Sequence, residues 1–291
     1  MDDKTNPIFL IFHLAIMSIV FTIVALTKYV DGYSDLLRQS TIENGPFEWG
    51  TAMVLFAIGV YTLFFLFQNR TDLKRNIFFL ILISSLALLA FLGAIEEISW
   101  GQNVFQFKSN DFFFHYNKQK ETNLHNLIDP QIFNVIINTP FYVLFLFFPL
   151  ALHFFINHSV VKRLKKNGYL EFVPSIHITL MFCFACSLQA FFLPITYADT
   201  FVLGVCLISF SIFIFTRKKY RSFSYILHLV FTIVSAIFFL MSYSIFSYEN
   251  MQYEIREFVF VYAFFFWFIQ FTSIVKKRYI LRSDPNKIRL S

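Results

Sequence analysis

The chain has 291 residues, of which 57% are hydrophobic and only 14% are charged, and its net charge is +6. Soluble domains carry about 25% charged residues, so this chain lacks the polar side chains that would cover a water-exposed surface. With a mean hydropathy of +0.61, the composition excludes a soluble enzyme, a disordered chain and a nucleic-acid-binding protein, and it indicates a membrane protein.

Eight apolar runs have about the length, roughly 17–25 residues, that crosses a bilayer as a helix. They cover residues 8–30, 50–67, 77–95, 132–156, 172–193, 201–216, 223–246 and 258–275. Backbone groups inside lipid must be satisfied within the segment, which favours helices over strands. The sequence therefore predicts an all-α, polytopic transmembrane helix bundle over residues 1–275, with Pro140 and Pro149 bending the fourth span.

The basic residues predict the orientation of this bundle. They gather in alternate connections and in the tail, residues 276–291, so that 18 of the 24 Lys and Arg fall on one side. By the positive-inside rule, both termini and the basic tail are then cytoplasmic. The first run is expected to be an anchor, because no cleavage site follows it. A composition rich in Phe, Ile, Asn and Lys suits a bacterial genome, so we expect a bacterial inner-membrane protein surrounded by membrane lipids.

The acidic residues sort the opposite way, and two of them are unusually placed. Glu96 and Glu97 follow the third apolar run directly, in the string EEISWGQ. We expect the helix to continue to Trp100 and to stop at a left-handed Gly101. Two carboxylates at the partially negative end of a helix, close to lipid, are expected to bind a proton or a cation.

The longest connection, residues 101–131, follows on the outer side. Its phenylalanines argue against disorder, and a loop of this length tends to be functional. It ends in ETNLHNL, where apolar residues at helical spacing predict a short helix that buries them. These residues are Leu124, Leu127 and Ile128. Glu121 and His125 would then lie four apart on one face, as a metal-ligand pair or as a histidine base oriented by a carboxylate.

These residues define the predicted site. Its catalytic candidates are Glu96, Glu97, Glu121 and His125, and Glu97, Glu121 and His125 are also candidate ligands for a divalent metal. Supporting candidates are Trp100, Gln102, Asn123, Asn126, Glu48, Glu254 and Glu257. The last three open predicted spans, where an acid also has a structural explanation in the helix dipole.

The two strings EEISWGQ and ETNLHNL together resemble a signature of polytopic bacterial membrane proteins to which no reaction is attached. The resemblance implies that the polar residues of the two strings belong together. It implies no activity.

Histidines also occur inside the predicted spans, at His13, His177 and His228. A polar ring in hydrocarbon usually finds a partner on another helix, so each is expected to make an interhelical contact.

Three functions fit these patterns. The first is a membrane-embedded enzyme acting on a lipid or lipid-linked substrate at the outer leaflet. The second is a transporter, in which the carboxylates form the entry of a cation or proton pathway. The third is a non-catalytic assembly or sensor subunit that docks a partner on its acidic outer rim.

Overall fold

The computed structural model of the chain divides into two compact units, and all its described elements are helical. Unit 1 comprises residues 1–47 and 137–263, and unit 2 comprises residues 48–136 and 264–291. The structure describes residues 7–30, 45–74, 76–117, 120–124, 127–128, 132, 136, 139–155, 157–189, 196–216, 223–241 and 251–280.

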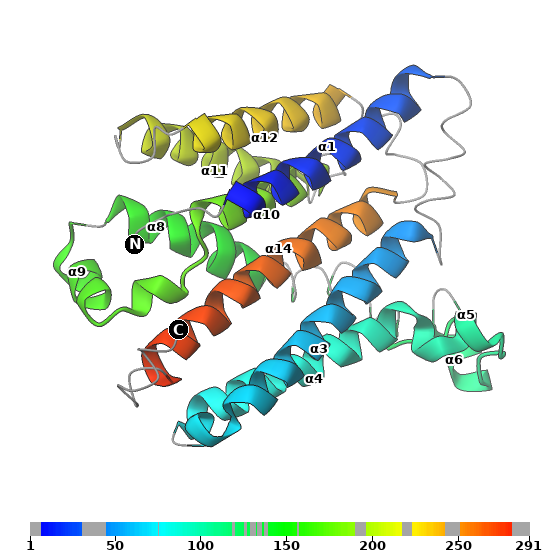
Figure 1. The fold of residues 1–291 in the computed structure, drawn as a ribbon. Coiled ribbons are helices and arrows are strands. Elements are labelled where there is room, and N and C mark those ends of the chain that lie inside the picture. The colour runs from blue at the N-terminus through cyan, green and yellow to red at the C-terminus, as the bar shows by residue number, and fades with distance from the viewer. Residues whose placement is uncertain are drawn as a thin grey trace. The chain divides into compact units, whose positions relative to one another are not determined.

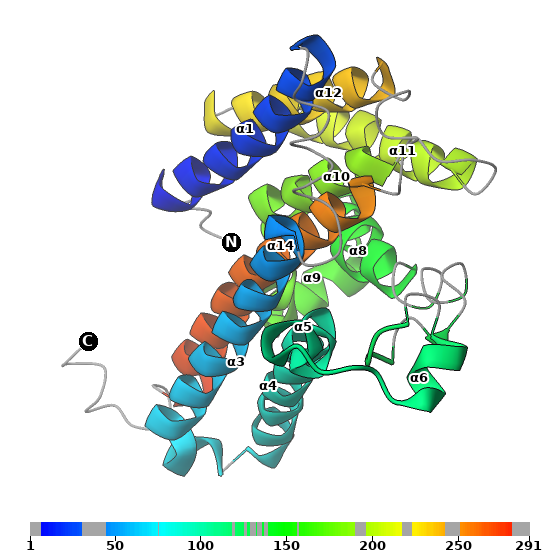
Figure 2. The same ribbon diagram turned by 90° about the vertical axis from the view of Figure 1, so that its right-hand side faces the viewer.

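Unit 2 is built on a helical hairpin. Helices α3 (Pro46–Leu73) and α4 (Ile77–Glu97) run side by side and are joined by a short turn (Figures 1 and 2). The short helices α5 (Gln102–Phe105) and α6 (Asp111–Tyr116) follow at the far end of α4. The C-terminal half of α14 (Met251–Val275) belongs to the same unit and continues into a π-helical turn, Lys276–Ile280.

Helix α3 makes close contacts with both α14 and α4. The hydroxyl of Tyr61 on α3 lies 2.9 Å from Oγ1 of Thr272 on α14, which anchors α3 to α14. A Cβ added to Gly59 of α3 would lie 2.7 Å from the ring of Phe91 on α4, closer than real contacts allow. Small residues commonly permit such close approach between helices in membranes, where packing rather than hydrophobic burial drives association.

Unit 1 is arranged around a central buried helix, α10 (Ile176–Gln189). Residues 176–188 are all buried, as expected for a helix that is apolar on every side. It contacts α1 (Pro7–Tyr29), α11 (Thr196–Thr216) and α12 (Phe223–Met241). The N-terminal half of α14 completes the unit together with three shorter elements. These are a π-helix at Tyr142–Phe147, α8 (Phe148–Phe154) and α9 (Ser159–Lys166).

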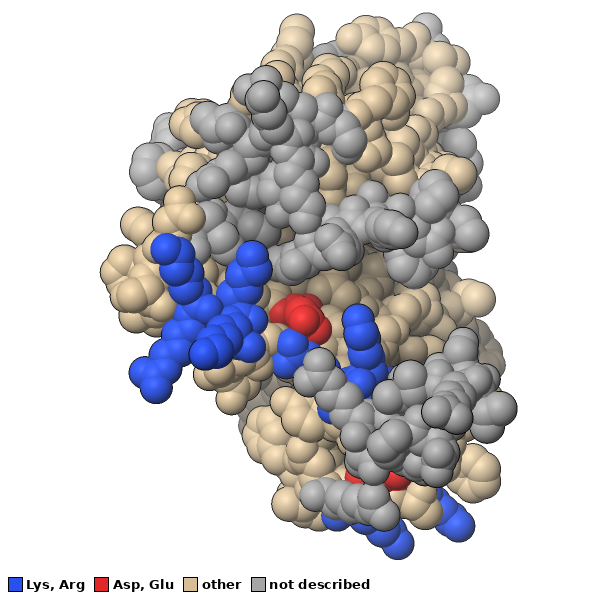
Figure 3. All heavy atoms as spheres, turned by 60° about the vertical axis from the view of Figure 1, so that its left-hand side comes forward, with Lys and Arg blue, Asp and Glu red and all other residues tan. Residues whose placement is uncertain are grey.

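Helix α9 is short, amphipathic and strongly basic. Val161 is buried and Leu164 packs against a small apolar cluster that also contains Leu152, Leu170 and Val173. On the other face Lys162, Arg163, Lys165 and Lys166 are exposed, and Figure 3 shows them as one basic patch. This separation of faces is typical of a helix that lies along an anionic membrane surface.

In the part of the chain that the structure describes, three helices are long and apolar enough to cross a membrane: α3, α4 and the segment Glu254–Tyr279. Shorter apolar helices lie at Leu10–Leu26, Thr139–Leu152, Ile176–Leu188 and Phe223–Phe239. The predicted all-helical class is therefore confirmed in the described residues, with three helices that are candidates for crossing a membrane, whereas the count of eight spans and the orientation stay predictions.

Several helices extend beyond the predicted spans, as α3, α11 and α14 do, and two further differences occur next to prolines. The fifth span was expected from Phe172, but α10 begins at Ile176, because the residue before Pro174 is kept out of the helical conformation. In the fourth, the backbone between Pro140 and Pro149 widens into the π-helix Tyr142–Phe147. Proline has no N–H for the helical ladder, and the wider turn precedes Pro149, the prolyl residue near the start of α8.

The predicted orientation can be tested with single cysteines at Asn110 and Asn167. Both residues are exposed, and the three native cysteines are buried. An impermeant maleimide added to right-side-out spheroplasts should label Asn110→Cys, whereas Asn167→Cys should react only after permeabilisation. Labelling of both from the outside would contradict the predicted topology.

The close approach of α3 and α4 predicts that Gly59→Ala destabilises the protein. Overpacking costs about 1–3 kcal/mol, which should lower the melting temperature in detergent. The matched control is Gly204→Ala on α11, where an added Cβ meets nothing within 4 Å. That control should melt at or above the temperature of the unchanged protein. Equal melting temperatures for the two variants would contradict the packing of Gly59 against Phe91.

Candidate functional site

A left-handed turn separates α4 from the loop that follows it. Helix α4 ends at Glu97, and Ser99, Trp100 and Gly101 have φ values of 47°, 55° and 81°. Left-handed backbone suits glycine but costs other residues roughly 1–2 kcal/mol each. Gly101 is thus left-handed as predicted, while the helix ends three residues earlier than expected. Strain of this kind persists only where surrounding contacts impose it.

Glu96 connects the end of α4 to the distant segment 121–124. Its Oε1 accepts a hydrogen bond from the indole Nε1 of Trp100 at 2.5 Å. Its Oε2 accepts one from the backbone N–H of Leu124 at 2.7 Å. Both oxygens of this carboxylate therefore hold parts of the loop in place, and the bond to Trp100 stabilises the left-handed turn.

Glu121 is the buried carboxylate of the site. It is 8% exposed, and its neighbours Ser99 and Asn123 are 0% and 1% exposed. The Ser99 hydroxyl donates to Glu121 Oε2, and Asn123 Nδ2 lies 3.1 Å from the same oxygen and 3.2 Å from Ser99 Oγ. A buried charge is tolerated when it is hydrogen-bonded in this way. No described residue donates to the other oxygen, Oε1.

Asn117 fixes this group from behind. Its Nδ2 donates to the backbone oxygen of Asn123 at 2.9 Å and to Asn123 Oδ1 at 2.8 Å. Its Oδ1 accepts from the backbone N–H of Glu121 at 3.4 Å. Asn117 is buried, so its amide determines how both Glu121 and Asn123 are presented.

Gln102 and Ser109 join the remaining part of the loop. Gln102 Oε1 accepts from the Thr122 N–H at 2.7 Å and lies 3.0 Å from Ser109 Oγ. Ser109 Oγ also lies 2.6 Å from the backbone oxygen of Lys120. We refer to the whole set as the 96–124 network. Its members are Glu96, Ser99, Trp100, Gln102, Ser109, Asn117, Glu121, Thr122 and Asn123.

The segment that carries the network also carries exposed aromatic side chains. Phe105, Phe107, Phe112, Phe114 and Tyr116 are all exposed, as is Trp100. The ammonium group of Lys120 lies 5.1 Å from the ring centre of Phe114. Exposed aromatic rings beside a buried polar group suit the region between lipid headgroups and acyl chains.

The network contains two of the four catalytic candidates, Glu96 and Glu121, and three supporting ones, Trp100, Gln102 and Asn123. Glu97 lies half-buried in the last turn of α4, and Glu48 opens α3 in the same unit. Glu254 and Glu257 lie on α14 within unit 1. His125 and Asn126 lie outside the described residues. Among the described residues, no three His, Cys, Asp or Glu side chains are placed to hold a metal ion.

The short helix predicted around Glu121 does not include residues 121–124, although Leu127 lies in a 3₁₀ turn and its N–H donates to the Leu124 carbonyl oxygen at 3.1 Å. Residues 121–124 are not helical, and Leu124 and Ile128 are exposed, not buried. The amide of Leu124 is instead bonded to Glu96, so a tertiary contact replaces the helical bond. Sequence reasoning also missed Ser99, Ser109, Asn117 and Thr122. Their only signal is that they are small polar residues within an aromatic segment.

Comparison with known proteins found no matching family model, no matching curated protein and no matching solved structure.

The left-handed turn predicts that Gly101→Ala destabilises unit 2. A Cβ at this φ of 81° would lie 3.0 Å from Phe105 Cδ2, and the left-handed conformation alone costs about 1–2 kcal/mol. The melting temperature should therefore fall. Gly101→Asn should retain more stability, because asparagine tolerates this conformation better. If the alanine variant melts at the higher temperature of the two, backbone conformation is not what requires glycine here.

Proposed function

We propose that this chain is an eight-span protein of the bacterial inner membrane with both termini in the cytoplasm. We further propose that it is a membrane-embedded enzyme acting on a lipid or lipid-linked substrate, with the 96–124 network as its active site at the outer leaflet. The observation that carries this proposal is the buried carboxylate of Glu121, held through one oxygen beside a strained left-handed turn.

Glu121 has the arrangement expected of a general acid or base. Ser99 and Asn123 bond to Oε2 and fix the position of that oxygen, and no described residue donates to Oε1, which in the proposal takes or gives the proton. A positioned carboxylate of this kind contributes about 10²–10⁴-fold to a rate. Glu96 has a different role in the proposal, because both its oxygens already hold the loop. It is a positioning residue.

The surroundings favour a lipid substrate. The exposed rings of Trp100, Phe105 and Tyr116 belong to the same segment as the network, and aromatic rings are enriched where proteins meet lipid headgroups. A lipid headgroup would reach the carboxylate from the interface without entering water. The resemblance of the two strings to polytopic bacterial membrane proteins agrees with this proposal, since the network joins the two strings through Glu96, Ser99 and Gln102.

The proposal predicts that Glu121→Gln abolishes turnover while the protein still folds. Glutamine keeps the shape and the acceptor oxygen but cannot act as a base, so a loss of about 10²-fold or more is expected. The measurement is a mass-spectrometric lipid profile of cells lacking the protein and complemented with each form. A lipid species should accumulate without the protein and with Glu121→Gln, and should disappear with the unchanged chain.

Asp111→Asn is the matched control, because it neutralises an exposed acid of α6 in the same loop. It should complement fully. Full complementation by Glu121→Gln would contradict the acid–base role. A lipid profile unchanged by loss of the protein would contradict the enzyme, and altered ion uptake in those cells would then favour the transporter. If neither the lipid profile nor ion uptake changes, the hypothesis of a non-catalytic subunit is favoured.

A further inference from the structure

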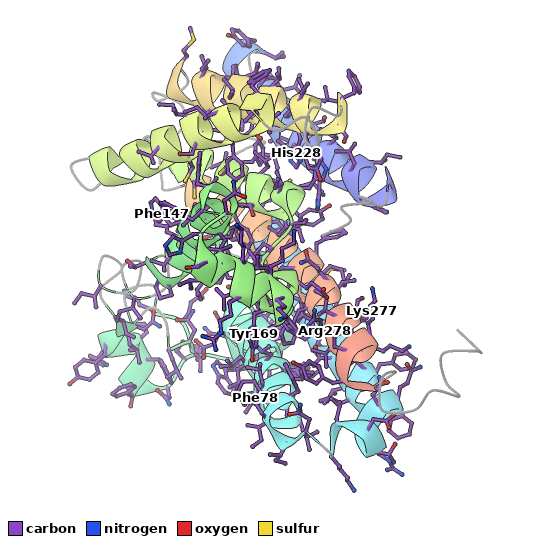
Figure 4. The ribbon with its side chains drawn as sticks, turned by 90° about the vertical axis from the view of Figure 1, so that its left-hand side faces the viewer. Phe78, Phe147, Tyr169, His228, Lys277 and Arg278 are labelled. Atoms are coloured by element: carbon purple, nitrogen blue, oxygen red, sulfur yellow. The ribbon has the colours of Figure 1, made fainter. Side chains whose placement is uncertain are left out.

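Unit 1 contains a cluster of buried histidines that has no part in the 96–124 network. His13 of α1, His177 of α10 and His228 of α12 are 1%, 2% and 0% exposed. Tyr225 and Tyr262 lie against them. We call these five residues the histidine cluster. Figure 4 marks His228 where α12 meets α1.

The rings of His177 and His228 face each other edge to edge. Their Nδ1 atoms are 3.1 Å apart, their planes differ by 15° and their centroids are 5.4 Å apart. This centroid distance is about what the nitrogen–nitrogen distance and two ring radii give together, so the nitrogens point at each other in nearly one plane. One ring must then donate an Nδ1–H, and the other must accept with a bare Nδ1.

This hydrogen bond gives the two neutral rings opposite tautomers. The donor ring has a bare Nε2, and the acceptor ring has an Nε2–H. Both Nε2 atoms are buried, and no described residue bonds to either. Buried polar atoms normally have a partner, and exceptions call for an explanation. The pair therefore presents one proton acceptor and one proton donor to the apolar interior of unit 1.

Such a pair can pass a proton without storing charge. A proton from water binds the bare Nε2 of the first ring, the Nδ1–H of that ring moves along the hydrogen bond to the second ring, and the second ring releases its Nε2–H to water or to the neighbouring His13. One N–H bond forms and one breaks at each ring. One proton enters and one leaves, and both rings end neutral with their tautomers exchanged.

The cluster extends beyond this pair. The centroids of His13 and His228 are 5.9 Å apart and their planes are tilted by 32°, so the two rings are neighbours, but no hydrogen bond joins His228 Nε2 to His13, and transfer between them requires a water molecule or a ring movement. His13 Nδ1 in turn lies 3.3 Å from the hydroxyl of Tyr262 on α14. Tyr225 stacks on His177 with centroids 4.2 Å apart. The titratable groups around the pair are thus His13 on α1, Tyr225 on α12 and Tyr262 on α14.

The members of the cluster lie at graded positions along their helices. His177 is the second residue of α10, His228 the sixth of α12 and His13 the seventh of α1. Tyr262 lies close to the middle of α14. His177 therefore lies at the end where α10 begins, and Tyr262 lies well within α14.

We propose that the histidine cluster is a proton relay from the end of unit 1 where α10 begins, through His177, His228 and His13, to Tyr262. Chains of ionisable residues within apolar helices commonly carry protons in this way. The geometry favours a relay over a metal site, because the described residues contain no group of three ligands placed for an ion. The relay stands independently of the enzyme proposed above.

The test is ¹⁵N NMR of the full chain, labelled at histidine and reconstituted in lipid bilayers. A relay exchanges tautomers, so the Nδ1 signals of His177 and His228 should be averages of protonated and bare nitrogen. The ring N–H of His13 should exchange rapidly with D₂O. In His177→Phe, exchange at His13 should slow by about tenfold or more, because it then requires local opening of the helices.

His115→Phe is the matched control, since His115 is exposed on α6 in unit 2, and it should leave exchange at His13 unchanged. Fixed tautomers with protected N–H groups in the unchanged chain would overturn the relay and leave a structural hydrogen bond. Zn²⁺ shifting the signals of both His177 and His228 would overturn it in favour of a metal site. These two outcomes need no variant, so they decide the proposal even if His177→Phe fails to fold.

Discussion

A polar group that this chain removes from water is costly unless it finds a hydrogen-bonding partner within the protein. The long apolar stretches meet this requirement through their own helical backbone, which is why α3 and α4 follow directly from composition. The loop after α4 cannot do so, because its backbone is irregular. There the side chains of Glu96, Asn117 and Gln102 bond to backbone groups in place of the missing ladder.

The two units differ in how far hydrogen bonds satisfy their buried polar groups. In the 96–124 network, carboxylates and amides donate to and accept from one another, and the result is a fixed loop in which no described residue donates to Oε1 of Glu121. In the histidine cluster, a pair of neutral imidazoles satisfies only the two facing nitrogens. The network therefore fixes the geometry of the loop, whereas the histidine pair keeps one nitrogen that can accept a proton and one N–H that can donate one.

Most of the helices could be predicted from the sequence because their apolar runs are long and few other structures can bury such runs. The errors occur at the ends. Helix α4 stops at Glu97 because Glu96 and Ser99 take tertiary partners beyond the helix. Residues 121–124 stay outside the expected helix for the same reason, since the amide of Leu124 bonds to Glu96. Local spacing carries no information about a partner 28 residues away.

The sequence by itself indicated a lipid environment and an all-helical fold, and it selected Glu96, Glu121 and three of their neighbours as candidate site residues. Composition and unusual polar residues can be recognised locally, without the tertiary structure. Only the tertiary structure decided what these residues do to one another. In the folded chain both oxygens of Glu96 accept hydrogen bonds from the loop, and Glu121 is buried against Ser99 and Asn123. His177 and His228 come together from different helices. Hydrogen-bond geometry depends on distances in space, which residue order does not encode directly.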